Sequence, residues 1–231
     1  MSLSDRYDTF YQSSLEREIF VDERVAAWPR NRVAAIVAYA GEGGSVLDAG
    51  CGSGQLLFHL RHRFEKLIGL EYSGQRLAQA KVNLAELPFV GVQGSMEAMS
   101  EIETGSVDCV VSADTIEHVP DVYPAAGELF RVLRPGGRLV INTPNIAFIK
   151  KRALLLLGRF PSTSQSNEGF GSDVLFDGGH LHYFTFRSLA LLLTRAGFKI
   201  EARVGYGRFG RLHDLYPPLL SGGVQLVACK V

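Results

Sequence analysis

The stretch Val46-Leu47-Asp48-Ala49-Gly50-Cys51-Gly52-Ser53-Gly54 decides the fold of this 231-residue chain. A short apolar run ends in a turn with three alternate glycines, and an apolar helical pattern begins at Gln55. Glycine adopts positive φ without steric cost and lets a ligand approach the backbone closely. The first N–H groups of the following helix have no partner within that helix. The stretch therefore predicts a buried strand, a ligand-binding turn and a helix.

Strands and helices alternate on both sides of this turn. The apolar patterns predict helices over 33–40, 55–63, 75–87 and 123–133, and strands over 45–49, 66–70, 89–92, 106–111 and 138–142. Such alternation is typical of a mostly parallel sheet with helices on both faces. Ligands of these sheets bind beyond the carboxyl ends of the strands, where the strand order reverses. A later helix over 186–196 and strands over 198–204 and 224–229 predict an antiparallel hairpin at one edge.

The remaining segments are assigned to one domain over residues 1–231. Residues 1–40 are interpreted as an N-terminal helical cap, and residues 144–182 as an inserted lid that defines an acceptor pocket. Within that insert, the pattern predicts a helix over 146–157, and residues 158–179 are rich in Gly and Ser.

The segment Phe148 to Phe160 mixes aliphatic side chains with Lys150, Lys151, Arg152 and Arg159. Two interpretations are open. The helix packs on the domain while its long basic side chains reach the solvent, or it touches a membrane surface or a lipid-like acceptor. The first is favoured.

Composition narrows the class of protein. Hydrophobic residues make up 46% of the chain, and 24 Lys and Arg balance 24 Asp and Glu. The zero net charge disfavours a protein that depends on the nucleic-acid backbone for affinity. No signal peptide or apolar run of membrane-spanning length is found, so a soluble, cytoplasmic protein is expected. The three Cys and six His show no ligand spacing, and no metal site is predicted.

The glycine turn differs from a dinucleotide fingerprint at two positions. Gln55 stands where a G-x-G-x-x-G pattern needs its third glycine, and Asp48 precedes the first glycine by two residues. A carboxylate there is badly placed for a pyrophosphate and well placed for a cationic amino group. Glu71 follows the next predicted strand, where a carboxylate can accept both hydroxyls of a ribose.

These features resemble the class I S-adenosylmethionine-dependent methyltransferases, and the similarity covers about residues 30 to 230. The quoted glycine stretch, Glu71 and Leu133-Arg134-Pro135-Gly136-Gly137 carry it. Ser112 to Asp121, with its Glu117-His118 pair, and His180 to Thr185 resemble segments of the type 11 and type 23 methyltransferase-domain groups. The resemblance implies a Rossmann-like α/β three-layer sandwich with seven strands in the order 3-2-1-4-5-7-6, the seventh antiparallel.

The resemblance also implies a set of residues that bind S-adenosyl-L-methionine. Gly50 and Gly52, with the neighbouring backbone of Ala49 and Cys51, would lie against its methionine part and ribose. Glu71 would hold the ribose hydroxyls and Tyr72 would flank the adenine. The remaining expected contacts are Asp48, Ser95, Met96, Ala113 and Asp114, with Tyr11 and Arg32 folding over the cofactor from upstream. Ser95 replaces an acid that relatives often carry.

Three histidines are candidates for acid–base chemistry. A hydroxyl acceptor carries a proton at neutral pH and needs a base, whereas a carboxylate acceptor does not. His118 is expected near the carboxyl end of the fourth strand, and His180 and His182 flank the predicted lid. Each alternatively has only a structural role.

The sequence thus predicts O-methylation of a small-molecule acceptor, such as a sugar, a lipid-linked compound or a secondary metabolite. A weaker similarity to MetW-like proteins supports an alternative, a partner-binding or regulatory protein. A nicotinamide oxidoreductase is disfavoured by Asp48 and Gln55. The oligomeric state stays open.

Overall fold

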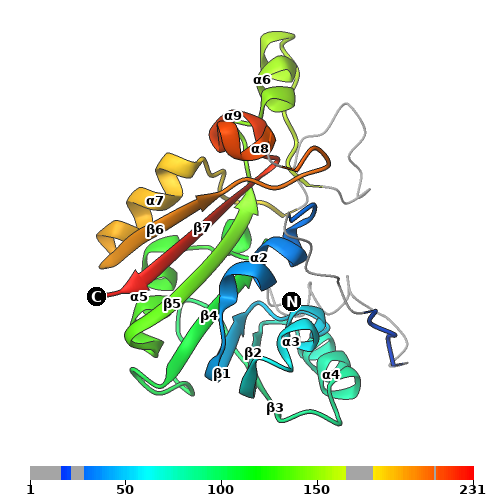
Figure 1. Ribbon diagram of the computed structural model, residues 1–231, viewed down its shortest axis with the longest axis vertical. Coiled ribbons are helices and arrows are strands. Elements are labelled where there is room, and N and C mark those ends of the chain that lie inside the picture. The colour runs from blue at the N-terminus through cyan, green and yellow to red at the C-terminus, as the bar shows by residue number, and fades with distance from the viewer. Residues whose placement is uncertain (1–16, 22–28, 165–178, 211) are drawn as a thin grey trace.

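A computed structural model describes residues 17–21, 29–164, 179–210 and 212–231. Its centre is a seven-stranded sheet with the order β3-β2-β1-β4-β5-β7-β6 (Figure 1). The strands are β1 (Gly43–Ala49), β2 (Phe64–Glu71), β3 (Phe89–Gln93), β4 (Val107–Ala113), β5 (Leu133–Pro144), β6 (Phe198–Val204) and β7 (Gly223–Lys230). The predicted strand order and fold class are confirmed.

The first five strands are parallel, and β7 is antiparallel to both of its neighbours, β5 and β6. β1 lies between β2 and β4, so the strand order reverses next to β1. The glycine turn after β1 therefore lies at the position where such sheets bind ligands.

Helices cover both faces of the sheet. The described helices are α2 (Arg32–Ala40), α3 (Gln55–Leu60), α4 (Gly74–Asn83), α5 (Val122–Val132), α6 (Ile149–Leu156), α7 (Phe186–Arg195), α8 (Leu212–Leu215) and α9 (Pro217–Leu220), with a 3-10 turn η1 (Ile116–His118). One apolar cluster joins the sheet to α2, α3 and α4, and another joins it to α5 and α7. The three layers follow from these two clusters.

Several element ends differ from the sequence prediction for a local reason. The helix expected to reach Leu87 ends at Asn83, and the helix expected to reach Arg63 ends at Leu60. Leu133, expected to be the last helical residue, is extended and begins β5. Pro135 favours an extended conformation at Arg134, the second residue of β5, and α5 passes into β5 without a loop.

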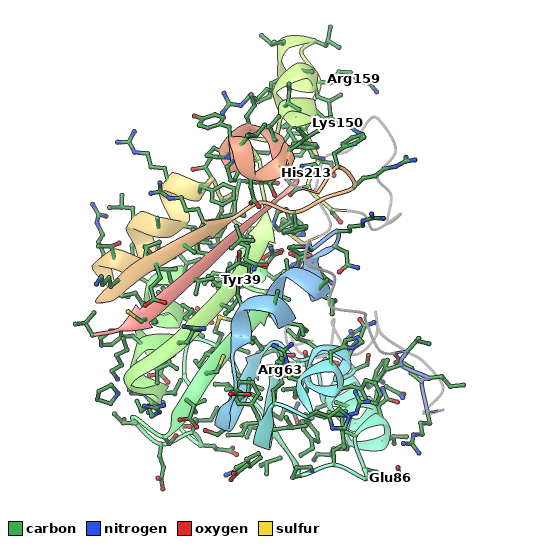
Figure 2. All side chains as sticks on the ribbon, viewed as in Figure 1. Tyr39, Arg63, Glu86, Lys150, Arg159 and His213 are labelled. Atoms are coloured by element: carbon green, nitrogen blue, oxygen red, sulfur yellow. The ribbon has the colours of Figure 1, made fainter. Side chains whose placement is uncertain are left out.

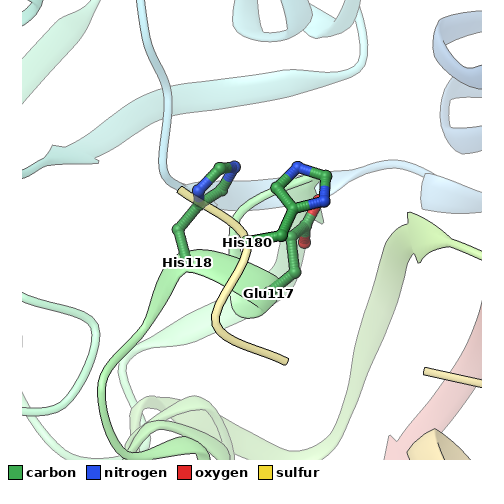
Figure 3. Close-up of side chains that lie close together, drawn as sticks. All are labelled: Glu117, His118 and His180. Carbon is green, nitrogen blue, oxygen red and sulfur yellow. The ribbon is translucent and has the colours of Figure 1, made fainter. Parts of the chain in front are cut away.

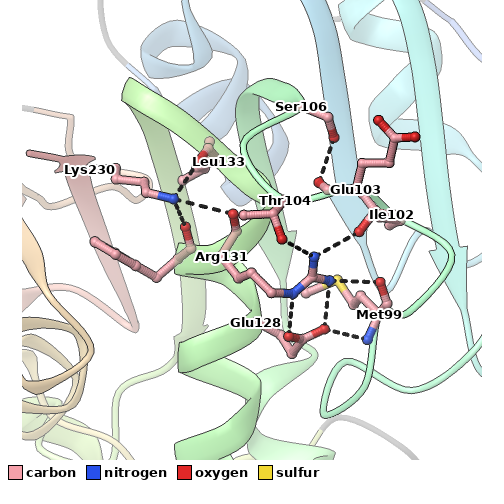
Figure 4. Close-up of polar contacts among 10 residues, drawn as sticks. Met99, Ile102, Glu103, Thr104, Ser106, Glu128, Arg131, Leu133 and Lys230 are labelled. Atoms are coloured by element: carbon pink, nitrogen blue, oxygen red, sulfur yellow. Dashed lines mark hydrogen bonds and ion pairs between the residues drawn. The ribbon is translucent and has the colours of Figure 1, made fainter.

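Arg131 and Lys230 fix the end of α5 against its surroundings (Figure 4). The Arg131 guanidinium donates to both carboxylate oxygens of Glu128 and to the carbonyls of Met99 and Ile102. The Lys230 ammonium donates to the carbonyls of Phe130, Arg131 and Leu133 at 2.7–3.2 Å. Because the last carbonyls of a helix have no intrahelical donor, this lysine of β7 supplies one.

The α6 helix is mostly exposed, with only Lys151 and Leu154 of its eight residues half-buried, so it packs on the domain much less than the favoured interpretation of the segment Phe148 to Phe160 expects. Among the eight residues of α6, all of which the structure describes, none is buried. Leu155, Leu156 and Leu157 are 56%, 88% and 74% exposed. Lys150 and Arg159 lie at the same end of the molecule (Figure 2).

Two short helices, α8 and α9, lie around Pro217-Pro218 in the connection between β6 and β7. They gather with α6 beyond the carboxyl end of β5 (Figure 1). Each has four residues, too few for apolar periodicity to reveal. In the described ranges, no helix combines the length and apolar character needed to cross a bilayer.

Candidate functional site

A cavity of about 360 Å³ lies at the carboxyl ends of β1, β2 and β4. This volume is in the range of small-molecule sites. Ten of the predicted site residues line it: Arg32, Gly50, Gly52, Glu71, Tyr72, Ser95, Met96, Ala113, Asp114 and His118. The topology thus brings together residues from five separate stretches of the sequence.

The glycine turn shapes one wall by the absence of side chains. Gly50 has φ +94°, and a Cβ built on it would lie 2.2 Å from Oγ1 of Thr115. Gly52 has φ +55°, and its Cβ would lie 2.5 Å from a guanidinium nitrogen of Arg76. Any other residue at either position would have to displace a neighbour, so the turn needs glycine to bring its backbone to the cavity wall.

Glu71 holds this turn from the end of β2. Its Oε2 accepts from the Gly52 N–H at 2.8 Å, and its Oε1 accepts from the Ser73 N–H at 2.9 Å. A carboxylate has about four lone-pair positions, so each oxygen retains capacity for a second donor. The Ser73 side chain caps α4 by accepting from the Arg76 N–H. One carboxylate therefore orders the glycine turn and the start of the next helix.

Asp48 lies behind the glycine turn and is 2% exposed. Burial, followed by repulsion from Glu71, raises the pKa of this carboxyl to about 8. Within the described part of the chain, Oδ1 of Asp48 is buried without a hydrogen-bond partner. Such an oxygen carries a desolvation cost that a cationic donor would relieve. An ammonium group close to Asp48 would supply such a donor; because Asp48 does not line the cavity, its contact with the cofactor stays a prediction.

The buried Asp48 makes stability depend on pH. Its pKa is about 8 in the folded protein against 3.8 for the ordinary carboxyl, so the folded state holds the proton more tightly. Its contribution to stability is fully present below about pH 4 and is lost as pH rises to about 8. In Asp48→Asn, we expect the unfolding free energy to fall less steeply over this range, the difference being at most about 1.4 kcal/mol per pH unit. Urea titrations at several pH values measure it.

The matched control for that experiment is Glu101→Gln, a change at an exposed position. It should follow the parent protein at every pH. Parallel pH curves for Asp48→Asn and the parent would contradict the assignment of the titration to Asp48.

Arg32 and Asp114 form an ion pair across the cavity. Burial raises the pKa of Asp114, and Arg32 and His118 partly oppose this rise. Asp114 has φ +47°, which is uncommon for a residue other than glycine. The predicted role of Arg32, holding a carboxylate of the cofactor, requires the guanidinium to serve both partners; that role stays a prediction.

The other residues predicted to contact the cofactor differ in their solvent exposure and in whether they line the cavity. Met96 is 4% exposed and belongs to the apolar core, whereas Tyr72 is 37% exposed. The Ser95 hydroxyl donates to Glu97 at 3.0 Å and so is engaged within its own loop. Asp48, Ala49 and Cys51 are buried and do not line the cavity, and Tyr11 lies outside the described residues.

The three candidate histidines lie on one side of the cavity. His118 lines it, and its Nδ1 lies 3.1 Å from the carbonyl of Gly179. The His118 and His180 rings meet edge to face with centroids 4.6 Å apart. His182 lies further out, with Nε2 3.2 Å from the carbonyl of Pro120. Only His118 of the three is part of the cavity wall.

Glu117, in the segment Ser112 to Asp121, is a buried acid for which the sequence predicted no role. It is 1% exposed, and Oε2 accepts from the Thr143 hydroxyl at 2.9 Å. Burial and then the neighbouring Asp114 raise the pKa of Glu117 to about 8. Arg76, Glu97 and Thr115 also line the cavity and were not predicted. Their only sequence signal is that each follows soon after a strand or a predicted site residue.

The comparisons with known proteins agree with this geometry. Residues 47–141 match the family model described as a methyltransferase domain. A Mycolicibacterium smegmatis protein named probable S-adenosylmethionine-dependent methyltransferase is 31% identical over 170 residues, 73% of this chain and 57% of that protein. The ubiquinone biosynthesis O-methyltransferase of Sodalis glossinidius is 31% identical over 105 residues, 45% of this chain and 42% of that protein.

Among solved structures, an S-adenosylmethionine-dependent methyltransferase from Mesorhizobium loti is similar, with a TM-score of 0.62 and 19% identity. The alignment covers 85% of this chain and 95% of that one, and it shows the shared fold. The chain spans 42–57% of the length of the two curated relatives. Their names give no support to the alternative of a MetW-like regulatory protein.

Proposed function

Because this chain belongs to the class I S-adenosylmethionine-dependent methyltransferases, an enzyme family that uses S-adenosyl-L-methionine, we propose that it methylates a hydroxyl of a small-molecule acceptor. The observation that carries the proposal is the cavity itself. It combines the glycine turn, the Glu71 carboxylate and His118 at the carboxyl ends of the strands. The glycine turn suits an amino-acid moiety, Glu71 suits the hydroxyls of a ribose, and His118 suits an acceptor hydroxyl.

Each part of the cavity has a separate task in this proposal. Glu71 accepts the ribose hydroxyls while its two backbone bonds keep the glycine turn in place. Asp48 lies directly behind the glycine turn and outside the cavity wall, and in this proposal the charge of the ammonium group compensates for its burial. Arg32 lies at the cavity wall, where a guanidinium suits a carboxylate. The chain therefore acts mainly by orienting two reactants and excluding water.

The transfer is an in-line displacement for which the bound cofactor supplies an activated methyl group. The acceptor oxygen forms the new C–O bond, the C–S bond breaks, and the sulfur keeps the electron pair of that bond. The acceptor hydroxyl gives up its proton, and His118 is the cavity residue best placed to assist that loss. The proton then passes to the solvent.

The proposal predicts that His118→Gln lowers kcat by about 100- to 10,000-fold, the usual effect of general acid–base assistance. Binding of S-adenosylhomocysteine should change little, because glycine-turn and Glu71 contacts remain. Release of S-adenosylhomocysteine during incubation with a panel of phenols, sugars and isoprenoid phenols measures turnover. Isothermal titration measures binding.

His62→Gln is the control, since His62 is exposed and lies outside the cavity wall. It should retain the parent kcat. A His118→Gln variant with the parent kcat would contradict any part for His118 in proton loss.

The exposed end of the molecule favours an acceptor that carries an apolar tail or resides at a lipid surface. Leu156 and Leu157 on α6 and Leu215 on α8 are at least 74% exposed. Lys150, Arg152 and Arg159 surround the α6 leucines in sequence and are exposed. Apolar side chains among cations are typical of segments that bind anionic lipid. The hydroxyl of Thr163, which follows α6, lies 2.7 Å from His180, so this end connects to the cavity mouth.

We therefore expect the full chain to float with vesicles of phosphatidylcholine and phosphatidylglycerol, and much less with phosphatidylcholine alone. The double variant Leu156→Asp/Leu157→Asp should stay with the free protein, because each change costs apolar contact and adds repulsion. Leu191→Asp, on α7 and 49% exposed, is the control and should float as the parent does. Equal flotation of all three proteins would contradict the role of α6.

A further inference from the structure

Glu117, His118 and His180 place three potential metal ligands together (Figure 3), and one of them, His118, lines the cavity. The carboxylate oxygen and imidazole nitrogens that they offer lie within 4.8 Å of one another. Glu117 and His118 are adjacent on η1, whereas His180 lies 62 positions after His118 in the chain, near the end of the predicted insert over 144–182. Sequence spacing could not reveal this group, because His180 reaches it only through the fold.

The backbone holds the two parts of the group in place. The Leu181 and His182 N–H groups both donate to the Glu117 carbonyl, at 2.8 and 3.1 Å. The Gly179 carbonyl lies 3.1 Å from Nδ1 of His118. These contacts tie the residues on both sides of His180 to η1. His180 is therefore held beside Glu117 by backbone contacts that do not depend on its own side chain.

The Glu117 carboxylate is the feature that points to a ligand. Oε2 accepts from Thr143, but in the part of the chain that the structure describes, Oε1 is buried with no hydrogen-bond partner. Glu117 is 1% exposed and lies under the His180 ring (Figure 3). A buried carboxylate oxygen without a donor is costly, and a cation is the partner that most fully offsets its charge.

The donor set selects the kind of ion. Mg²⁺ and Ca²⁺ prefer oxygen ligands alone, whereas two imidazoles with one carboxylate suit Zn²⁺, Fe²⁺, Co²⁺ or Mn²⁺. Because a carbonyl can only accept, Nδ1 of His118 donates to Gly179, and its Nε2 carries the lone pair. A hydrogen bond from one ring nitrogen to a carbonyl is typical of metal-binding histidines. Donors on one ion lie about 3–4 Å apart, so closing the group needs a shift of roughly 1 Å.

We propose that Glu117, His118 and His180 bind one divalent transition-metal ion at the wall of the acceptor cavity. Three protein ligands leave coordination positions for water or an acceptor oxygen. The further role of the ion rests on the proposed function: a hydroxyl bound to it would lose its proton to the solvent more readily. His118 then acts as a ligand.

The test uses the untagged full chain after treatment with a chelator. Titration with Co²⁺, followed by visible absorption, should show one ion per chain with a Co²⁺–imidazole spectrum, and Zn²⁺ should displace it. Glu117→Gln and His180→Gln each remove a ligand, so each should weaken the binding by at least the roughly 10- to 100-fold that loss of a hydrogen-bond partner of a ligand costs. His182→Gln is the matched control and should bind Co²⁺ as the parent does.

Binding that is absent, or unchanged in both Glu117→Gln and His180→Gln, would overturn the metal site. Circular dichroism of His180→Gln, a change at a half-buried position, separates loss of binding from loss of folding. A thermal shift with S-adenosylhomocysteine is recorded on the same samples. Metal binding without that shift would leave the metal site standing and reject the proposed function; the reverse result would reject the metal site alone.

Discussion

Replacement of Glu71 by alanine is expected to weaken the binding of S-adenosylhomocysteine by about 100- to 10,000-fold. The variant removes the acceptor of the Gly52 and Ser73 N–H groups together with the proposed acceptor of the ribose hydroxyls. Hydrogen bonds to charged groups contribute about 1.5–3 kcal/mol each, and every 1.4 kcal/mol is a factor of ten in affinity. Isothermal titration of the parent and the variant measures the difference.

Two further variants serve as controls for the Glu71→Ala measurement. Glu71→Gln keeps the shape and loses the charge, so it should bind with intermediate affinity. Glu65→Ala changes an exposed acid at the other end of the same strand and should bind as the parent does. An affinity for Glu71→Ala within threefold of the parent would remove Glu71 from the binding site.

Gly50→Ala is the second substitution with a large expected effect. The alanine would have to adopt φ near +94°, and its Cβ would overlap the Thr115 side chain. Left-handed backbone costs a residue other than glycine about 1–2 kcal/mol, and overpacking typically adds about 1–3 kcal/mol. We expect a loss of unfolding free energy on the order of 3 kcal/mol, measured by urea denaturation, and loss of cofactor binding.

Gly127→Ala provides the opposite expectation. Gly127 lies within α5, and among the described residues no heavy atom is within 4 Å of the Cβ that the change would add. Because glycine is costly inside a helix, this change should raise the unfolding free energy by about 0.5–1 kcal/mol.

The double variant Gly50→Ala/Thr115→Ala should recover only the steric part of the unfolding free energy that Gly50→Ala loses. Equal stability of Gly50→Ala and the parent would mean that the turn tolerates a side chain.

The parts of the fold that could be predicted are those with a periodic apolar pattern. The five parallel strands and the helices between them each bury one apolar face, so their sequences carry the period of their structure. The sequence predicts the helix α6 but not its exposure. A helix with leucines and basic residues has the same sequence pattern whether or not another surface packs against it.

Cavity-lining residues were predictable where they lie at the carboxyl end of a strand, as Glu71 does in β2. Contacts between residues that are distant in sequence could not be predicted. Examples are the ion pair of Arg32 with Asp114 and the approach of His180 to Glu117. Burial was equally hidden. Nothing in the sequence distinguishes the buried carboxyl of Glu117 from the exposed carboxyl of Glu101.

The position of β7 has a consequence for the order in which the chain folds. β7 follows β6 in the chain, yet it lies between β5 and β6 and pairs with both of them. During synthesis, β6 therefore has no neighbour in the sheet until β7 has left the ribosome. Until then the edge of β5 is open, and open edges pair with other chains. We expect the nascent protein to be most prone to aggregation at this late stage and to depend on chaperones there.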